Sequence, residues 1–127
     1  MRPMVIDTSS LIFAVSNGKD PIEAVREMPQ GYEPVVSEGI IRELETIKER
    51  HGKYSRYAGA ALLIIRSQKV RIIRSSLRGS LPNVDSWILS EAAGKGYSVC
   101  TNDMKLKRSL KAAGIQAFSI TRAGLMR

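Results

Sequence analysis

Near the N-terminus, residues 3–10 read PMVIDTSS. The apolar residues 3–6 predict a short buried strand, and the polar residues after them predict a turn into a helix at 11–15. Asp7 stands directly after this strand. A carboxylate in that place lies near the core, where an unpaired charge is costly unless a metal ion or hydrogen bonds compensate it. Asp7 is therefore the first candidate functional residue.

Outward from this stretch, short apolar strands alternate with helices. Further strands are predicted at 34–36, 70–73, 97–101 and 115–120, and further helices at 21–28, 38–47, 54–67, 84–93 and 104–113. This alternation indicates a parallel sheet with helices on both faces. We therefore predict an α/β fold: a single three-layer α/β/α domain over residues 1–127 with a central parallel sheet of about five strands. Residues 74–82 are predicted to be a loop, and residues 121–127 a loosely attached tail.

The composition limits the chemistry open to the chain. Its 127 residues, of which 43% are hydrophobic and 25% charged, suit one soluble domain. The best apolar run, 58–65, is far shorter than the ~20 residues of a membrane span, and Asp7 comes too early for a signal peptide. No membrane partner and a cytoplasmic location are therefore expected. Because Cys100 and His51 are the only cysteine and histidine, a Cys/His zinc site is excluded and any metal ion must be held by oxygen.

The net charge of +8 is unevenly distributed along the chain. Residues 1–47 carry −4 and residues 79–103 carry −2, whereas residues 48–78 carry +8 and residues 104–127 carry +6. Carboxylates beside a surface that attracts a polyanion are typical of an enzyme that acts on nucleic acid. Lys and Arg can equally serve only to solubilise the surface, so the charge pattern alone does not decide between the two interpretations.

Four carboxylates are candidates for one site at the carboxyl ends of the predicted strands, where open α/β sheets bind ligands. Besides Asp7, Asp103 follows strand 97–101, Asp85 opens a helix, and Glu43 flanks the apolar stripe of another helix. Mg²⁺ and Mn²⁺ prefer such oxygen ligands. Three of the acids also have a simpler interpretation: Asp85 and Asp103 suit helix N-termini, and Glu43 suits a solvated helix face.

Four short motifs occur in a characteristic order: VIDTS at 5–9, IIREL at 40–44, VD at 84–85 followed by Ile88 and Ala92, and TND at 101–103 followed by Leu106 and Gly114. Together they resemble the PIN-domain nucleases over nearly the whole chain, most of all compact archaeal-type proteins similar to ribosomal-RNA-processing nucleases, with the VapC toxin branch next. The resemblance implies an acidic pocket that binds Mg²⁺ or Mn²⁺ and cleaves RNA endonucleolytically.

The resemblance also implies roles for particular residues. It makes Asp7, Glu43, Asp85 and Asp103 the catalytic and metal-binding acids, and it gives Thr8, Ser9, Thr101 and Asn102 the role of supporting these acids or a metal-bound water. Many family members have a further acid where this chain has Ser86, so weaker binding of a second metal ion is expected. An aspartyl phosphatase is disfavoured, because Ser9 occupies the place of its second aspartate.

RNA is the expected partner of the basic segments. The residues predicted to hold its backbone are Arg66, Lys69, Arg71, Lys105 and Lys107. Tyr54 or Tyr57 is predicted either to stack on an unpaired base or to pack in the core, and the apolar stretch 58–65 either to form a homodimer surface or to belong to the core. The functions considered are a metal-dependent endoribonuclease, with ribosomal RNA processing as its context; a VapC-type toxin with an antitoxin; and a non-catalytic RNA-binding or assembly module, for example with a pre-ribosomal partner.

Overall fold

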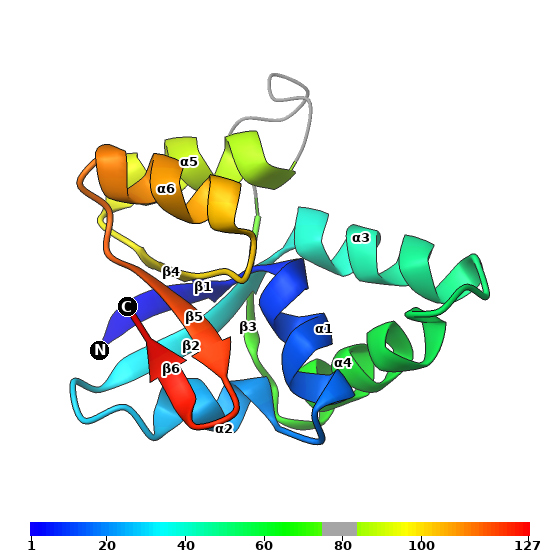
Figure 1. Ribbon diagram of the computed structural model, residues 1–127. Helices are drawn as coiled ribbons and strands as arrows, with labels where there is room; N and C mark the ends of the chain where they lie inside the picture. Colours follow the sequence, from blue (N-terminus) through cyan, green and yellow to red (C-terminus); the bar gives the residue numbers. More distant parts are fainter. Residues whose placement is uncertain (75–83) are drawn as a thin grey trace.

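The computed structural model describes residues 1–74 and 84–127, which contain a six-stranded sheet (Figure 1). The strands lie in the order β3-β2-β1-β4-β5-β6. Their bounds are β1 Arg2–Ile6, β2 Tyr32–Ser37, β3 Arg71–Ile73, β4 Ser98–Cys100, β5 Ala117–Thr121 and β6 Gly124–Met126. The first five are parallel, and β6 is antiparallel to β5. The loop predicted at 74–82 lies, apart from Arg74, outside the described residues.

Helices cover both faces of this sheet. Their bounds are α1 Thr8–Ser16, α2 Pro21–Arg26, α3 Glu38–Glu49, α4 Ser55–Ser67, α5 Val84–Lys95 and α6 Met104–Ala112. On one face, α5 and α6 pack on each other and on β4 and β5 (Figure 1). On the other face lie α1 and α2, and α3 and α4 form a helical hairpin that packs against α1. The predicted three-layer α/β/α architecture is confirmed. Among the described residues, no helix has both the length and the apolar character that crossing a membrane requires.

Local side-chain chemistry sets the start of several helices. The Asp20 side chain accepts hydrogen bonds from two backbone N–H groups at the start of α2, and the Ser37 hydroxyl accepts one from Ile40 at the start of α3. These N–H groups have no partner inside their own helix, so the caps stabilise the first turns. Helix α1 begins at Thr8 rather than at residue 11, because the chain enters the helix directly after Asp7.

Strand β1 lies in the middle of the core. Met4, Val5 and Ile6 are fully buried, as expected for a central strand of a parallel sheet that is covered on both faces. From β1 the strand order runs to β2 on one side and to β4 on the other. In an open α/β sheet this change of direction is where ligands bind, outside the carboxyl ends of the strands. Asp7, the residue after β1, therefore stands at the favoured position.

The C-terminal residues correct one expectation. Residues 121–127 were predicted to be a loose tail, but Gly124–Met126 form the strand β6, which pairs with β5 through a tight turn. The Thr121 hydroxyl donates a hydrogen bond to the carbonyl of Gly124 and accepts one from the N–H of Ala123, and both bonds close the turn. Gly124, Leu125 and Met126 include none of the β-branched or aromatic residues that indicate a strand in the sequence.

Candidate active site

Asp7 is a buried carboxylate at the end of β1. Its side chain is only 4% exposed, and its Oδ2 accepts hydrogen bonds from the hydroxyls of Thr101 at 2.8 Å and Ser9 at 3.1 Å. Burial raises its pKa from 3.8 to about 6, an effect that these hydrogen bonds reduce and the nearby charge of Asp85 increases. At neutral pH, Asp7 is thus a carboxylate whose charge is poorly solvated and would be stabilised by a cation.

The parallel register explains why Thr101 reaches Asp7 from 94 positions away in the sequence. Ile6 at the end of β1 pairs with Cys100 at the end of β4, so the residues that follow the two strands are neighbours. The backbone N–H of Asp7 donates to the carbonyl of Cys100 at 2.8 Å and extends this pairing. The Thr101 hydroxyl also accepts from the N–H of Asp103 at 3.1 Å. One hydroxyl therefore connects the two acids.

Asp85 and Asp103 reach the same place from the first turns of α5 and α6. Asp103 is the N-cap of α6, where its Oδ1 accepts from the N–H of Lys105 at 2.9 Å and of Leu106 at 3.2 Å. The pKa of Asp85 is raised, first by partial burial and then by the charge of Asp103, whereas Lys105 lowers it. The helix-cap interpretation of Asp103 and its place beside another acid are therefore both correct.

Glu43 is supplied by a different element, the helix α3. Helix α3 approaches α5 at Gly39, where an added Cβ would lie only 3.3 Å from Cγ2 of Val84. Glu43, Asp7, Asp85 and Asp103 all line one hollow of about 630 Å³. The structure thus brings together the four acids predicted from the sequence.

The predicted supporting residues occupy different positions around this hollow. Ser9 and Thr101 hold Asp7, as described above, and their hydroxyls lie 3.2 Å apart. Thr8 lines the hollow, and its Oγ1 is buried without a hydrogen-bond partner among the described residues. Asn102 also lines it, but its side chain joins α1 to β5: it accepts from the Ser10 hydroxyl and from the N–H of Ile120, and it donates to the Ile120 carbonyl. Of these four supporting residues, Thr8 is thus the one whose hydroxyl has no hydrogen-bond partner in the described part of the chain.

The donors in the hollow suit a hard divalent cation. Carboxylate and hydroxyl oxygens are the ligands that Mg²⁺ and Mn²⁺ prefer, and the buried charge of Asp7 lacks a cation partner among the described residues. In that part of the chain, no three His, Cys, Asp or Glu side chains are grouped closely enough to hold a metal ion by themselves. Mg²⁺ keeps several waters and commonly uses one or two carboxylates, so the residues fit an ion held partly through water.

The comparisons with known proteins agree with this geometry. A family model described as a PIN-like domain matches residues 4–122. The chain belongs to the PIN-like domain family. This confirms the resemblance found in the sequence motifs. PIN domains are usually nucleases, and as a family they use divalent metal ions. No curated protein matches this PIN-like domain in sequence.

Solved structures share the fold of the PIN-like domain. The PIN domain endonuclease Utp24 matches 97% of this chain and 88% of its own, with a TM-score of 0.79 and 22% identity. VapBC-1 from nontypeable Haemophilus influenzae matches 91% of this chain and 96% of its own, with a TM-score of 0.61 and 18% identity. VapBC2 from Rickettsia felis matches 92% and 98%, with a TM-score of 0.66 and 16% identity. Identities this low support a shared fold and nothing finer.

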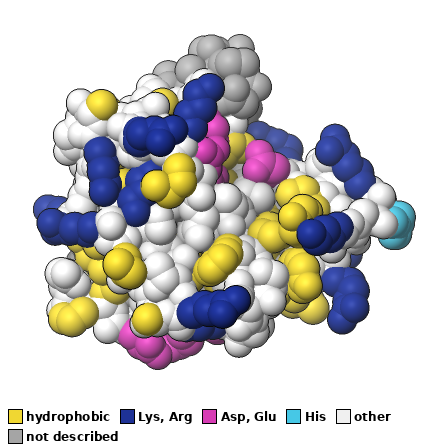
Figure 2. Space-filling model, viewed as in Figure 1, with side chains coloured by type: hydrophobic (Ala, Val, Ile, Leu, Met, Phe, Trp, Pro, Cys, Tyr) yellow, Lys and Arg dark blue, Asp and Glu magenta, His cyan; other side chains and the backbone are white. Residues whose placement is uncertain are grey.

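Basic side chains flank the acidic hollow of the PIN-like domain. On the face shown in Figure 2, acidic side chains near the centre lie between Lys and Arg over α6 and Lys and Arg over the α3–α4 hairpin. Lys105, at the start of α6, is the predicted RNA-binding residue whose charge acts on an acid of the hollow, Asp85. Cations beside a group of acids offset the repulsion between these acids and the phosphates of a nucleic acid.

Lys107 and Arg71 differ from the expectation that they hold RNA. Lys107 is 7% exposed and donates to the Ser119 hydroxyl at 2.8 Å, and burial lowers its pKa. Its ammonium therefore points into the protein rather than toward a phosphate. The Arg71 guanidinium makes two hydrogen bonds to the Glu33 carboxylate, both of 3.1 Å. These guanidinium N–H groups are thus already bound to a carboxylate.

Lys69 and Arg66 are exposed but lie away from the hollow. Lys69 precedes β3, so it lies at the amino end of this strand. The acidic hollow lies beyond the opposite, carboxyl ends of the parallel strands. Arg66, near the end of α4, lines a separate hollow of about 640 Å³ with Lys48 and Arg56. Charge along the sequence could not reveal these placements, because they depend on the direction of each strand and helix.

One wall of the acidic hollow consists of residues outside the predicted site. It is formed by Ile12, Phe13 and Ser16 of α1, Ile47 of α3, and Tyr54 just before α4. In the sequence, the apolar members of this wall have the spacing of core residues. Tyr54 is 48% exposed, which distinguishes it from them.

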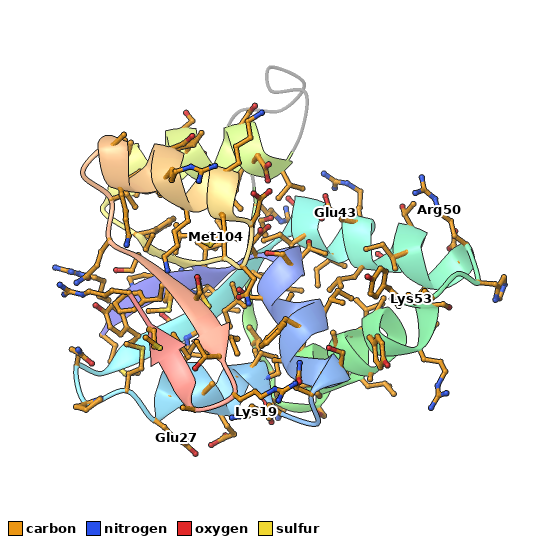
Figure 3. The ribbon with its side chains drawn as sticks, in the orientation of Figure 1. Lys19, Glu27, Glu43, Arg50, Lys53 and Met104 are labelled. Atoms are coloured by element: carbon orange, nitrogen blue, oxygen red, sulfur yellow. The ribbon has the colours of Figure 1, made fainter. Side chains whose placement is uncertain are left out.

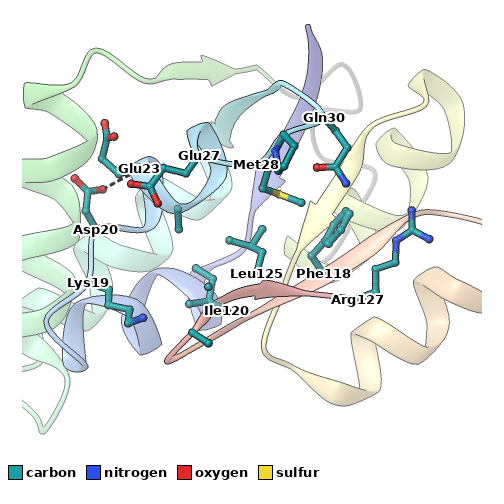
Figure 4. A pocket seen from close by; sticks show the side chains of 14 residues that line it. Lys19, Asp20, Glu23, Glu27, Met28, Gln30, Phe118, Ile120, Leu125 and Arg127 are labelled. Carbon is teal, nitrogen blue, oxygen red and sulfur yellow. Dashed lines mark hydrogen bonds between the residues drawn. The ribbon is translucent and has the colours of Figure 1, made fainter.

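A further hollow of about 700 Å³ lies between α2, the loop after it and the β5–β6 hairpin (Figure 4). Phe118, Ile120 and Leu125 form its apolar floor, and Glu23 and Glu27 stand at its edge. Glu23 is paired with Arg26, and Arg127 lies over the Phe118 ring. None of the four acids of the candidate site lines this hollow.

Proposed function

We propose that this PIN-like domain is a divalent-metal-dependent endoribonuclease that hydrolyses RNA phosphodiester bonds at the hollow lined by the four acids. The observation that carries the proposal is the buried Asp7 carboxylate, held by Ser9 and Thr101, in the same hollow as three acids from three other elements. A buried carboxylate with further acids beside it destabilises a fold without a cation, so it suits a metal-binding role.

Mg²⁺ or Mn²⁺, when bound, supplies Lewis acidity at the phosphate and lowers the pKa of water. Asp7, Asp85 and Asp103 would bind the ion directly or through water, and the exposed Glu43 would bind it or orient the attacking water. Thr8, whose buried hydroxyl has no partner among the described residues, lines the same hollow. Lys105 would hold the RNA backbone beside these acids.

Cleavage of a labelled RNA with Mg²⁺, with Mn²⁺ and with EDTA tests the proposal. Asp7→Asn and Glu43→Gln should lose most of the metal-dependent cleavage. Glu45→Gln is the matched control, because Glu45 is exposed on the same helix but does not line the hollow. Equal activity of the Glu43 and Glu45 variants, or cleavage by Asp7→Asn at the wild-type rate, would contradict the assigned site.

A non-catalytic RNA-binding or assembly module is the second candidate. The observation that favours it is that no three potential ligands in the described part of the chain are grouped closely enough to hold an ion by themselves. Retained RNA binding without cleavage under any divalent metal ion would support the module. Ribosomal RNA processing, with a pre-ribosomal partner, and a VapC-type toxin role, with an antitoxin, are the two biological contexts that we propose for the enzyme. Copurification from the native host would distinguish them.

A homodimer is a further proposal. Its basis in the sequence is the apolar stretch 58–65, four residues of which are buried within the protein. Ala58, Ala61, Leu62 and Ile65 of α4 pack in the core, which leaves Leu63, at 68% exposure, as the apolar residue available to a second copy. Light scattering of wild type and Leu63→Ser tests this idea. A wild type that is monomeric at high concentration would contradict it.

A further inference from the structure

The turn between α3 and α4 carries positive charge on both sides of Tyr54, a residue that lines the acidic hollow. Residues 48–56 include Lys48, Arg50, Lys53 and Arg56 against the single acid Glu49, which gives a net charge of +3. Among the described residues, none of these four cations has a carboxylate within salt-bridge distance. Unpaired cations on one turn attract a polyanion and leave its phosphates free to bind them.

Tyr54 connects this turn to the hollow. It is the residue before α4, it is 48% exposed, and it lines the same hollow as the four acids. The Lys53 ammonium lies 5.5 Å from the centre of its ring, and the ring of Tyr57 lies 6.5 Å away at an angle of 46°. An aromatic ring that packs in a core has no such exposure. The structure therefore removes the core interpretation for Tyr54.

We propose that Tyr54 is a stacking platform for one unpaired base of an RNA strand, with Arg50 and Lys53 of the α3–α4 turn holding the adjacent phosphates. This inference rests on the proposed function, and it adds to that function a residue that holds one unpaired base beside the acids. A base inside a duplex is already stacked on its neighbours and paired, so its face is not available to a tyrosine ring. An unpaired base offers that face, and an aromatic–cation pair binds it with little sequence preference.

The geometry also gives the platform a positioning role. A base on Tyr54 is held at the wall of the hollow, so a nearby phosphate of the same strand lies close to the acids. Figure 3 shows Glu43 on the same α3–α4 hairpin as Arg50 and Lys53, whereas Lys19 lies elsewhere on the molecule. Tyr54 would therefore place the strand without taking part in bond cleavage.

Binding of a labelled single-stranded RNA, measured by fluorescence anisotropy in EDTA, tests the platform independently of cleavage. Tyr54→Ala should weaken binding about ten-fold, and Tyr54→Phe, which keeps the ring, should stay within about three-fold of wild type. A duplex RNA of the same length should bind both variants and wild type equally. Lys53→Ala should weaken single-strand binding and reduce its salt dependence, whereas Lys19→Ala, a cation outside this turn, should not.

Several results would overturn the inference. They are an affinity unchanged by Tyr54→Ala, an equal loss for single-stranded and duplex RNA, an equal loss in the Ala and Phe variants, or a wild type that binds neither RNA. A change of oligomeric state in Tyr54→Ala would overturn it too, because the ring would then belong to a dimer interface. If wild type binds single-stranded RNA through Tyr54 but never cleaves it, the nuclease proposal fails and the platform stands. If cleavage depends on Asp7 but binding does not depend on Tyr54, the platform fails and the nuclease stands.

Discussion

Replacing Asp7 with asparagine should stabilise the metal-free protein at neutral and alkaline pH. The side chain is 4% exposed, and its pKa rises from 3.8 to about 6 on folding, because burial disfavours its charged form. A difference of that size corresponds to a cost of about 3 kcal/mol when the group is ionised in both states. Asparagine has nearly the same shape and no charge, so it should remove most of this cost.

The pH dependence follows from the direction of the pKa shift. Between the unfolded value of 3.8 and the folded value of about 6, the folded state binds more protons than the unfolded state, so stability falls as the pH rises. The cost of the charge should be about 3 kcal/mol at pH 8, about half of that at pH 5 and almost zero at pH 3. The advantage of Asp7→Asn over wild type should shrink in the same way.

Urea unfolding of both proteins in EDTA at several pH values measures this difference. Glu27→Gln, which removes an exposed carboxylate far from the hollow, separates the effect of burial from the effect of losing one negative charge. Adding Mn²⁺ should stabilise wild type more than the variant, since an ion that binds only the folded state shifts the equilibrium toward it. The reasoning is refuted if Asp7→Asn is less stable than wild type at pH 8, or if its advantage does not shrink on acidification.

Three other substitutions separate structural from functional roles. Asp103→Asn keeps an N-cap and removes a charge, so in EDTA its stability should match that of wild type within about 0.5 kcal/mol, whereas Mn²⁺ should no longer stabilise it. Asp103→Ala removes the cap and should lower the stability by about 1 kcal/mol. Equal melting temperatures of the two variants would contradict the capping role. Asn102→Ala removes three hydrogen bonds between α1, β5 and the site, so thermal unfolding should show a loss of about 2 kcal/mol even in EDTA. Lys107→Met should be more stable than wild type at neutral pH, because it removes a buried charge. This gain should shrink as the pH rises through the lowered pKa of the lysine. A variant less stable than wild type at pH 7 would show that the hydrogen bond to Ser119 outweighs the cost of burying the charge.

The fold was predictable because its signals are local. Buried strands such as β1 read as apolar runs, the helix that carries Glu43 shows the 3.6-residue period, and Asp20 and Ser37 mark helix starts through hydrogen bonds to residues two or three positions away. The six-stranded sheet departs from the predicted five only by β6, whose residues Gly-Leu-Met include no β-branched or aromatic residue. Residue types and their spacing thus specify the elements and most of their order.

The sequence also placed Asp7 after a strand, Asp85 and Asp103 at helix starts, and Glu43 along a helix, which is where each is found. It could not establish that they meet, because their distances depend on the β1–β4 register and on the close packing of Gly39 against Val84. It likewise assigned Lys107 and Arg71 to RNA by charge alone. Burial beside Ser119 and the ion pair with Glu33 become visible only when residues far apart in the chain are brought together.

The sequence by itself therefore determined the α/β class and the succession of strands and helices, since these follow from periodicity, capping and residue chemistry within a few positions. It also supplied four acids as candidates for one site. The tertiary structure decided which side chains share the hollow, which cations are free, and that Tyr54 faces the acids instead of the core. The physical reason is that solvent exposure and electrostatic interaction depend on distances in space. The hydrogen bond between Thr101 and Asp7, formed across 94 positions, exists only because two parallel strands pair in one register.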